Sequence, residues 1–442
     1  MPSDEVARDT IAAIAVAAGR GAIGVIRLSG AAVPGIARKV LGRLPEPRRA
    51  TFAAFRNARG EPEDEGIALY FPAPHSYTGE PVLELQGHGG PMVMQAVLRA
   101  CLDAGARLAE PGEFTRRAFL EGKLDLAQAE AVADLIDAAS REAARSALRS
   151  LGGEFSSAIG ALAAALVELR ALTEAMLDFP EEEVDSVHRE AAATRLAAVR
   201  QGLEEVLAKS RQGSLLRTGV HVVLAGRPNV GKSSLLNRLA GEERAIVTPV
   251  AGTTRDALRE PIQIEGVPLV LVDTAGLRAT APDLVERLGM ERTRQELERA
   301  DLVLVVHEAT QPRAPSPGDL PAGAQRVDVY NKADLARDFR PPADALAVSA
   351  KTGQGLDVLR KAIVSAAGWS GTGEPVFLAR ERHLRALESA RAHLDEAGRQ
   401  LPRWEFFAEE LRLAHAALAG ITGEFTADDL LGEIFSRFCI GK

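Results

Sequence analysis

The sequence predicts a multidomain protein of α/β plus α class, in which an N-terminal α+β domain precedes a helical bundle that an inserted α/β domain interrupts. The chain has 442 residues, of which 46% are hydrophobic and 26% are charged, enough to bury two or three separate cores. Short strand-like segments with glycine breaks fill the first 120 residues. Ala/Leu-rich segments with helical spacing flank a glycine-rich loop in the middle of the chain.

The N-terminal domain is expected to span residues 1–121. Strands are predicted at GAIGVIRLSG, EGIALYFPAP and EPVLELQGHGG, and helices at PMVMQAVLRACLDAG and FTRRAFLEG, a mixture typical of α+β folds. Polar residues near the glycines indicate a small-molecule pocket, although loop polarity would explain the same pattern. These residues are Arg27, His75, Tyr77, Glu84 and His88.

Two helical segments, residues 122–217 and 375–442, are expected to share one core. Neither looks self-sufficient, so the simplest account is a single bundle with a domain inserted over residues 218–374. A glycine-rich linker at 368–375 ends the insertion. The apolar residues that carry the helical spacing in the first segment are Leu135, Ile136, Leu148, Leu151, Ile159, Leu162, Leu166 and Leu169.

The inserted domain opens with a phosphate-loop motif. The run HVVLAG reads as a buried strand, and Gly226 to Ser233 then fit G-x-x-x-x-G-K-[ST] at the start of a helix. Loop N–H groups and the helix N-terminus can surround phosphate oxygens, while Lys232 reaches the β/γ-phosphates and Ser233 ligates Mg²⁺. The residues of this loop expected to touch the nucleotide are Asn229, Val230, Gly231, Lys232, Ser233 and Ser234.

Four further elements follow in order. GTTRD offers threonine hydroxyls, with Thr254 as the Mg²⁺ ligand, and DTAG offers Asp273 for the metal's water shell. In NKAD, the Asp334 carboxylate can accept two hydrogen bonds from guanine that adenine cannot donate. The domain is thus predicted to be a Ras-like P-loop GTPase domain that rejects ATP. The expected GTP contacts in these elements are Gly252, Thr253, Thr254, Asp273, Thr274, Ala275, Gly276, Asn331, Lys332, Asp334, Ser349, Ala350 and Lys351.

The position after DTAG departs from the Ras pattern, because apolar Leu277 stands where a glutamine would orient the attacking water. The nearby candidates are Arg278, Glu286 and Glu291. Only an acceptor can take the proton of water, which favours a glutamate, although charges on a solvated helix face would look the same. The amide oxygen of Asn229 could hold a monovalent cation beside the phosphates.

Composition and charge restrict the class of protein. The net charge of −8 argues against a chain-wide grip on a polyanion, and Cys101 and Cys439 form no disulfide framework. No membrane span or signal peptide is predicted, so a cytoplasmic location is expected. The tail FCIGK lacks the aliphatic residues of a prenylation box, and by default its lone cysteine would be a small core hydrophobe.

Several motifs together resemble one family, the MnmE (TrmE) tRNA-modification GTPases, over essentially the whole length. They are GRPNVGKSSL, GTTRD, DTAGLR with VERLGMER, RLSG, YTGEPVLELQGHGGP, EFTRRAFLEGKLDLAQAEA and the terminal CIGK. The resemblance implies that the chain, in a heterotetramer with the flavoprotein MnmG, installs an aminomethyl or carboxymethylaminomethyl group at C5 of the wobble uridine of certain tRNAs. It implies a homodimer through the N-terminal domains, and G domains that meet when loaded with GTP and K⁺.

The same resemblance implies roles for particular residues. A one-carbon donor, 5-formyltetrahydrofolate or 5,10-methylenetetrahydrofolate, would be bound by Arg27, Glu84, Lys123 and Lys442. The loop Thr248, Pro249, Val250 and Ala251 would join the GTP site. K⁺ would touch Asn229, Thr248, Val250 and Thr253, and Mg²⁺ would touch Ser233 and Thr254. The matching catalytic residues are Glu286, which would orient the water, Arg278, and Cys439 in the tail.

Two rival interpretations are kept. A ribosome-assembly GTPase of the Era or Der type shares the phosphate loop, TTRD and DTAG, but it would bring an RNA-binding module after the G domain. Here residues 376–442 hold 9 Lys/Arg against 11 Asp/Glu and no basic G-x-x-G loop. A folate-dependent one-carbon transferase with a regulatory GTPase domain is the second rival.

Overall fold

The computed structural model describes residues 9–17, 19–178, 185–242, 259–273, 295–312, 325–336, 338–371, 376–424, 428–436 and 438–441. The chain divides into two compact units, Met1–Ala133 with Ala419–Lys442, and Asp134–Leu418. The first unit therefore brings the two ends of the sequence together. The second holds most of the helical bundle and the inserted domain.

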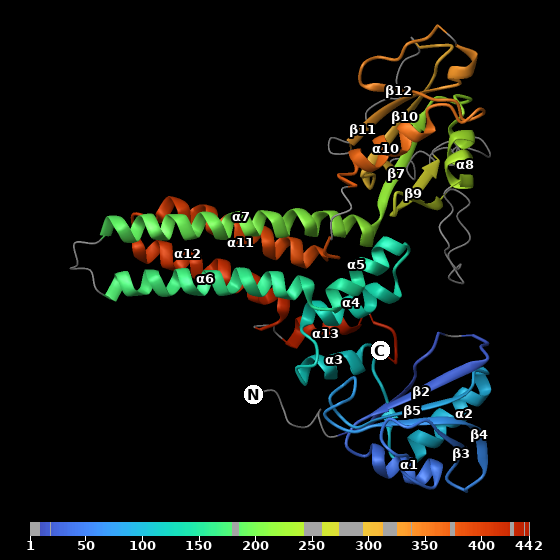
Figure 1. The fold of residues 1–442 in the computed structure, drawn as a ribbon. Coiled ribbons are helices and arrows are strands. Elements are labelled where there is room, and N and C mark those ends of the chain that lie inside the picture. The colour runs from blue at the N-terminus through green and yellow to red at the C-terminus, as the bar shows by residue number, and fades with distance from the viewer. Residues whose placement is uncertain are drawn as a thin grey trace. The chain divides into compact units, whose positions relative to one another are not determined.

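A six-stranded sheet forms the centre of the first unit (Figure 1). Its order is β3 (Thr51–Arg56), β4 (Pro62–Phe71), β5 (Val82–His88), β2 (Ile23–Ser29), β1 (Ile11–Ile14) and β6 (Arg107–Leu108). Neighbouring strands are antiparallel, except that β1 and β6 run parallel. The three predicted strands are confirmed as β2, β4 and β5, whereas the sequence analysis missed β1, β3 and β6.

The two faces of this sheet differ in what covers them. Ile26, Leu28, Leu83 and Leu85 alternate onto one face and form a core with α1 (Val33–Leu41) and α2 (Pro91–Asp103). Arg27 and Glu84 are register partners on adjacent strands, so they share a face. Because side chains alternate along a strand, that face is the one opposite the core. The predicted helix PMVMQAVLRACLDAG is confirmed as α2, and α1 is an addition to the prediction.

Three helices complete the first unit. The predicted helix FTRRAFLEG is confirmed as α3 (Glu113–Leu120), whose Phe114 packs against Ile11 and Ala13 of β1. The N-terminal part of α4 (Leu126–Ile136) and α13 (Asp428–Ser436) bury a separate apolar cluster with the tail. Members of this cluster are Leu126, Ala129, Leu431, Ile434, Phe435 and Phe438.

The bundle of the second unit is built from helices on both sides of the insertion. It contains α5 (Arg141–Leu151), α6 (Glu154–Asp178), α7 (Asp185–Thr218), α11 (Glu381–Gln400) and α12 (Trp404–Thr422). Helix α7 precedes the inserted domain, α11 follows it, and the two pack together (Figure 1). The predicted shared core is therefore confirmed. Ile159, Leu162, Leu166 and Leu169 are buried in it, whereas Ile136 and Leu148 are about half exposed.

One helix among the described residues, Glu154–Leu177 within α6, is long and apolar enough to cross a membrane when judged by length and composition alone. Its best window has a mean hydropathy of 1.5, and 28% of that window is buried. A helix that contributes to the core of a bundle passes the same test, and α6 packs against α5 and α7. The helix is accordingly weak support for a membrane span.

The inserted domain is a six-stranded sheet with the order β12 (Ala345–Ala347), β11 (Gln325–Asn331), β10 (Leu302–Glu308), β7 (Val220–Gly226), β9 (Val267–Asp273) and β8 (Arg259–Ile264). Only β8 is antiparallel to its neighbour among these strands. The strands β7 and β10 are buried apolar runs, as expected of a parallel sheet with both faces covered. Helices α8 (Lys232–Glu242) and α10 (Leu356–Ala366) pack on it, and the predicted α/β class is confirmed.

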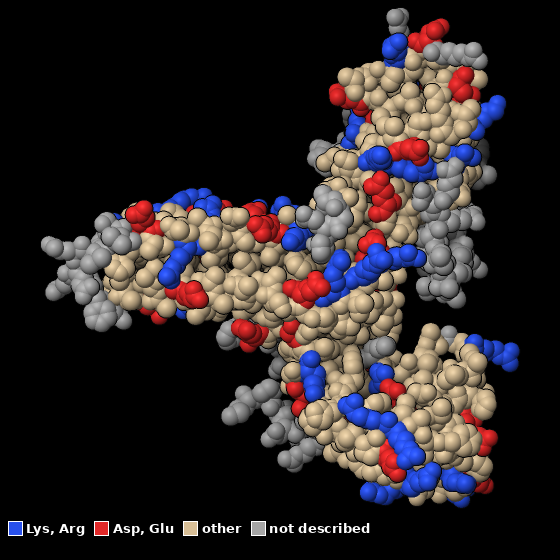
Figure 2. All heavy atoms as spheres, viewed as in Figure 1, with Lys and Arg blue, Asp and Glu red and all other residues tan. Residues whose placement is uncertain are grey.

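Charged side chains of both signs are interspersed on the face of the molecule seen in Figure 2. The view shows no extended single-sign field over the described helices or sheets, which agrees with the modest net charge of −8.

Candidate functional site

The phosphate loop connects β7 to α8 and needs glycine at both of its ends. Gly226 has φ 154°, and a Cβ there would lie 2.4 Å from the carbonyl oxygen of Val306. Gly231 has φ 92°, and a Cβ there would lie 2.3 Å from Nδ2 of Asn331. Asn229 also has a positive φ, 65°, a conformation that asparagine tolerates better than most residues. The loop is thus held open by backbone geometry that few other residues adopt.

Two polar side chains at the start of α8, those of Lys232 and Ser233, have defined hydrogen-bond partners. Lys232 is 5% exposed, and its Nζ donates to the carbonyl oxygens of Gly226 and Arg227, both at 2.9 Å. The Ser233 hydroxyl donates to Oδ2 of Asp273, the last residue of β9, at 2.5 Å. A hydroxyl and a carboxylate side by side are the oxygen donors that Mg²⁺ prefers, so these residues fit that metal.

The NKAD and SAK motifs, which the sequence predicts to recognise the base, are joined to the phosphate loop through Asn331. Its side chain is buried, donates to the Val230 carbonyl at 3.0 Å, and accepts from the Ala350 N–H at 3.0 Å. Ser349 in turn donates to Oδ1 of Asp334 at 2.6 Å. Hydrogen bonds therefore hold NKAD and SAK, 19 residues apart in the sequence, together beside the phosphate loop.

Lys332 in the NKAD motif is held in the left-handed region, with φ 62°. Its Nζ lies 3.1 Å from Oε1 of Glu308, at the end of β10. Hydrogen bonds from Thr310 and then from Lys332 lower the pKa of Glu308. This contact joins the NKAD motif to the end of β10.

A second polar site lies in the first unit, around Arg27. The Arg27 Nε donates to Oε1 of Glu84 at 2.9 Å, and its NH1 donates to the carbonyl oxygen of Gly441 at 3.5 Å. The guanidinium also lies over two aromatic rings, 5.5 Å from the centroid of Tyr77 and 5.9 Å from that of Phe114. A cation, a carboxylate and two aromatic faces thus meet next to the last described residue of the chain.

The tail reaches this site through backbone contacts. Gly441 has φ 98°, and a Cβ there would lie 2.6 Å from the carbonyl oxygen of Ile14. The Gly112 N–H donates to the carbonyl oxygen of Cys439 at 3.3 Å, and Pro111 forms an isolated bridge with Ile440. The Cys439 side chain is exposed. The default expectation of a buried hydrophobe therefore does not describe this cysteine.

Two protein-family models match this chain. A model of the MnmE helical domain matches residues 126–439, and a model of the GTP-binding protein TrmE N-terminus matches residues 10–123. The protein named tRNA modification GTPase MnmE from Azoarcus sp. (strain BH72) is 62% identical over 98% of both chains. The chain belongs to the MnmE tRNA modification GTPase family. It is therefore a GTPase, and the Era or Der alternative is set aside.

Other MnmE relatives agree with this assignment. The proteins of the same name from Aromatoleum aromaticum and Thiobacillus denitrificans are each 58% identical, over 98% of this chain and 98% of theirs. Among solved structures, the G domain of the T. maritima FeoB iron transporter covers 34% of this chain and 98% of its own at 24% identity. Its TM-score of 0.24 is too low to carry an inference.

Many of the site residues predicted from the motifs or from the MnmE resemblance lie outside the described residues. They are Thr248, Pro249, Val250, Ala251, Gly252, Thr253, Thr254, Thr274, Ala275, Gly276, Arg278, Glu286 and Lys442. Of the four folate candidates, Arg27 and Glu84 are bonded to each other. Lys123 is exposed and lies beside Gly79, which is in the loop that carries Tyr77. A Cβ added to Gly79 would be 3.5 Å from Cε of Lys123.

The two histidines proposed for the pocket have other contacts. His88 Nδ1 lies 2.7 Å from Oδ1 of Asp64, and this hydrogen bond raises the pKa of the exposed imidazole. The backbone carbonyl of His75 accepts from Arg48 at 2.6 Å. Among the described contacts, neither histidine bonds to Arg27 or Glu84.

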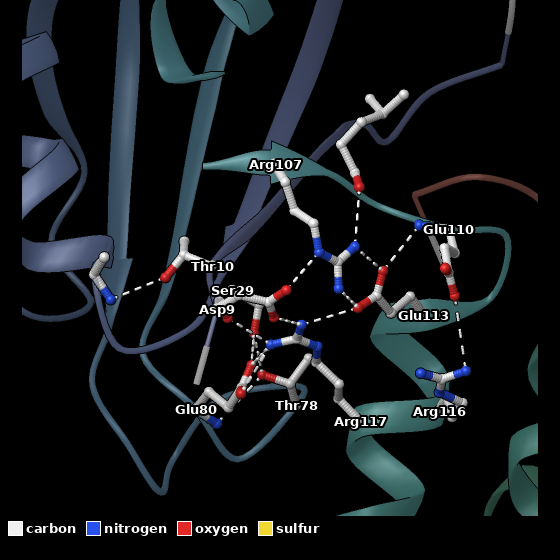
Figure 3. A network of polar contacts seen from close by, with 12 residues as sticks. Asp9, Thr10, Ser29, Thr78, Glu80, Arg107, Glu110, Glu113, Arg116 and Arg117 are labelled. Atoms are coloured by element: carbon white, nitrogen blue, oxygen red, sulfur yellow. Dashed lines mark hydrogen bonds and ion pairs between the residues drawn. The ribbon is translucent and has the colours of Figure 1, made fainter. Parts of the chain in front are cut away.

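Sequence reasoning missed a partly buried ion cluster in the first unit (Figure 3). Arg107 donates to both oxygens of Glu113, at 2.6 and 2.9 Å. Arg117 donates to Glu113 at 2.9 Å, to Asp9 at 2.7 Å and to Glu80 at 3.1 Å. Glu80 also accepts from Ser29 at 2.6 Å. The only signal in the sequence was the i,i+4 spacing of Glu113 and Arg117 on α3.

The cluster fixes the loop that carries Tyr77. Burial alone would raise the pKa of Glu113, but hydrogen bonds from Arg107, the Glu110 N–H and Arg117 hold it below its usual value. Glu80 follows Tyr77 by three residues, and Tyr77 itself bonds to Thr115 of α3 at 2.8 Å. Two contacts thus join the loop to α3: the ion pair between Glu80 and Arg117, and the hydrogen bond between the Tyr77 and Thr115 hydroxyl groups.

Proposed function

We propose that this chain hydrolyses GTP in order to modify tRNA at C5 of the wobble uridine, with MnmG and a tetrahydrofolate one-carbon donor. The product would carry an aminomethyl or carboxymethylaminomethyl group. The observation that carries the proposal is the contact of Arg27 with both Glu84 and the carbonyl of Gly441, which joins the N-terminal sheet to the CIGK tail. Family membership supports the GTPase and tRNA parts of it.

For hydrolysis, Lys232 would release its two loop carbonyls and bind the β/γ-phosphates. Ser233 would supply a hydroxyl to Mg²⁺, and Asp273 would hold the metal's water. Asp334, oriented by Ser349, would select guanine. Glu286 would orient the attacking water, with Arg278 beside it and with K⁺ held by Asn229, Thr248, Val250 and Thr253 while the G domains of two protomers meet.

The residues around Arg27 fit a reduced folate. Its pterin ring is flat and carries N–H donors, for which Tyr77 and Phe114 offer aromatic faces and Glu84 offers a carboxylate oxygen. Its glutamyl tail is anionic and would suit the ammonium groups of Lys123 and Lys442. When bound, the folate supplies the one-carbon unit. The chain's own part is to orient it, to exclude water, and to hold the Cys439 thiol beside it through the tail.

The face of the sheet that carries Arg27 and Glu84 supports a homodimer through this domain. Phe52 is 68% exposed and Ile67 is 40% exposed, and these two residues are register partners on β3 and β4. Ile23, at the start of β2, is 67% exposed. A second copy placed on this face would bury these side chains and enclose the site.

The experiment is nucleoside mass spectrometry of tRNA from a strain lacking the gene, complemented with variants. The wild-type chain should restore the modified wobble uridine. Cys439→Ser should restore none of it and still hydrolyse GTP, while Cys101→Ala, which changes a buried thiol with a pKa raised to about 12, should behave as wild type. An unmodified wobble uridine after complementation with the wild type would refute the proposal.

A further inference from the structure

Asp134, near the C-terminal end of α4, is a buried carboxylate with two arginine partners. It is 7% exposed. Its Oδ1 accepts from Arg217 Nε at 3.1 Å and from Arg380 NH2 at 2.8 Å, and its Oδ2 accepts from Arg380 Nε at 3.3 Å. Arg380 thus binds the carboxylate with two nitrogens, and Arg217 adds a third hydrogen bond.

The two arginines mark the places where the chain leaves and re-enters the bundle. Arg217 lies in the last turn of α7, three residues before β7 begins the inserted domain. Arg380 is the N-cap residue of α11, the first helix after that domain, and its N–H donates to Nδ1 of buried His383 at 3.1 Å. One carboxylate therefore holds both connections of the GTPase domain, although they are 163 residues apart in the sequence.

The two ends of α4 have different neighbours. Leu135, the next residue, packs against the apolar core that includes the inserted domain's strands. At the other end of α4, Leu126 and Ala129 pack against Phe435 of α13 and Phe438, which directly precedes Cys439. Asp125 and Gln128 cap that end reciprocally, at 2.8 and 3.0 Å. The same short helix thus contacts the GTPase domain's connections at one end and the segment that carries the tail at the other.

We infer that Asp134 is a positioning residue that couples the nucleotide state of the GTPase domain to the tail site. The inference rests on the proposed function, whose chemistry needs the two sites to communicate. A rearrangement of the inserted domain against the bundle would act on Arg217 and Arg380, because these residues flank its two connections. Their shared acceptor converts such a change into a force on α4, and α4 packs against α13 and against Phe438, the residue before Cys439. Asp134 itself touches neither nucleotide nor folate.

The test uses Cys439 of the purified full-length chain as its own reporter. Cys101 is fully buried and Cys439 is exposed, so a thiol reagent such as DTNB reads the tail. The rate would be compared between nucleotide-free protein and protein with GDP and aluminium fluoride in KCl. The wild type should show a difference of about 5-fold or more, the size of a typical coupling between sites. Asp134→Asn should reduce that ratio to nearly 1 while GTP turnover stays close to wild type.

The matched control is Asp137→Asn, which removes an exposed carboxylate three residues away. It should keep the wild-type ratio. If Asp134→Asn yields no soluble protein, Arg217→Gln offers the same comparison, because this arginine is about a third exposed and its loss leaves Arg380 on the carboxylate. A full nucleotide effect on Cys439 in the aspartate or arginine variant, or none in the wild type, would overturn the inference. Neither readout involves tRNA, so such a failure is distinct from a failure of the proposed function.

Discussion

Replacing Arg117 with methionine should destabilise the first unit strongly, because it removes the arginine partner of the largely buried Glu80 and one of the two arginine partners of the buried Glu113. Arg117 is 5% exposed and hydrogen-bonds Glu113, Asp9 and Glu80 (Figure 3). Methionine fills similar space but donates nothing. The Glu113 side chain is fully buried and would retain only Arg107 and the Glu110 N–H.

The magnitude follows from the cost of breaking a buried ion pair on one side, about 3–5 kcal/mol of unfolding free energy. For a domain of this size, 1 kcal/mol corresponds to about 2–4 °C in Tm, so a drop of roughly 6–20 °C is expected. The matched control is Arg116→Met on the same helix. Its side chain is 27% exposed, and its partner Glu110 lies at 3.8 Å, so the expected cost is at most about 1 kcal/mol.

The pH dependence of the defect has a definite sign. The pKa values of Glu113 and Asp9 are lowered in the folded protein, so their ion pairs stabilise it above the ordinary values of 4.5 and 3.8, and this stabilisation is lost as pH falls through the lowered values. Arg117→Met removes part of this term. The gap between wild type and variant should therefore be largest near neutral pH and should narrow below about pH 4.5.

Hydrogen exchange of peptides from β1, β2 and β5 is the assay that isolates this unit. Both tryptophans, Trp369 and Trp404, lie in the second unit, so their fluorescence provides an internal control that should not change. Unchanged protection of these strands in Arg117→Met, or an equal loss in Arg116→Met, would refute the reasoning. A gap that widens toward low pH would do the same.

Three further predictions concern the two sites. Steady-state GTP hydrolysis should rise strongly when K⁺ replaces Na⁺, since the proposed cation site includes Asn229, and equal rates in both salts would count against that site. Glu286→Ala should lower kcat and leave the affinity for a fluorescent GTP analogue unchanged, whereas a large loss of affinity would make the residue structural. Gly441→Ala should release the tail, because a left-handed alanine costs about 1 kcal/mol and its Cβ would lie 2.6 Å from the Ile14 carbonyl oxygen. The assay is the rate at which DTNB modifies Cys439, which should increase. An unchanged rate would show that the tail accommodates the alanine.

The inserted domain was the most predictable part of the chain. Its motifs specify backbone geometry locally, because Gly226 and Gly231 are required by positive φ and close contacts. The apolar runs of β7 and β9 are buried strands, and each can be identified from its own residues. The N-terminal strands β1 and β3 were missed for the opposite reason. IAAI and TFAAFR are short and show little polar alternation, so only their partners in the sheet make them strands.

The tail and the ion cluster lay beyond sequence reasoning for different physical reasons. Cys439, Ile440 and Gly441 dock mainly through main-chain atoms, which leave no pattern in the side chains, and only the family resemblance brought them to the folate site. The ion cluster joins residues from four separate segments. Ion pairs between segments that are distant in the sequence depend on the fold, so they cannot be predicted before the fold is known.

The choice between arginine and lysine in this chain follows the geometry of the acceptor. Lys and Arg total 53, and only eight are Lys. Arg27, Arg117 and Arg380 each bind carboxylates that a planar, multi-donor guanidinium suits, with Arg380 using two nitrogens on Asp134. Lys232 instead directs one compact ammonium at two carbonyls, both 2.9 Å away, within a loop where it is 5% exposed. Lys232 therefore marks a place in this arginine-rich chain where a compact point charge fits between backbone oxygens.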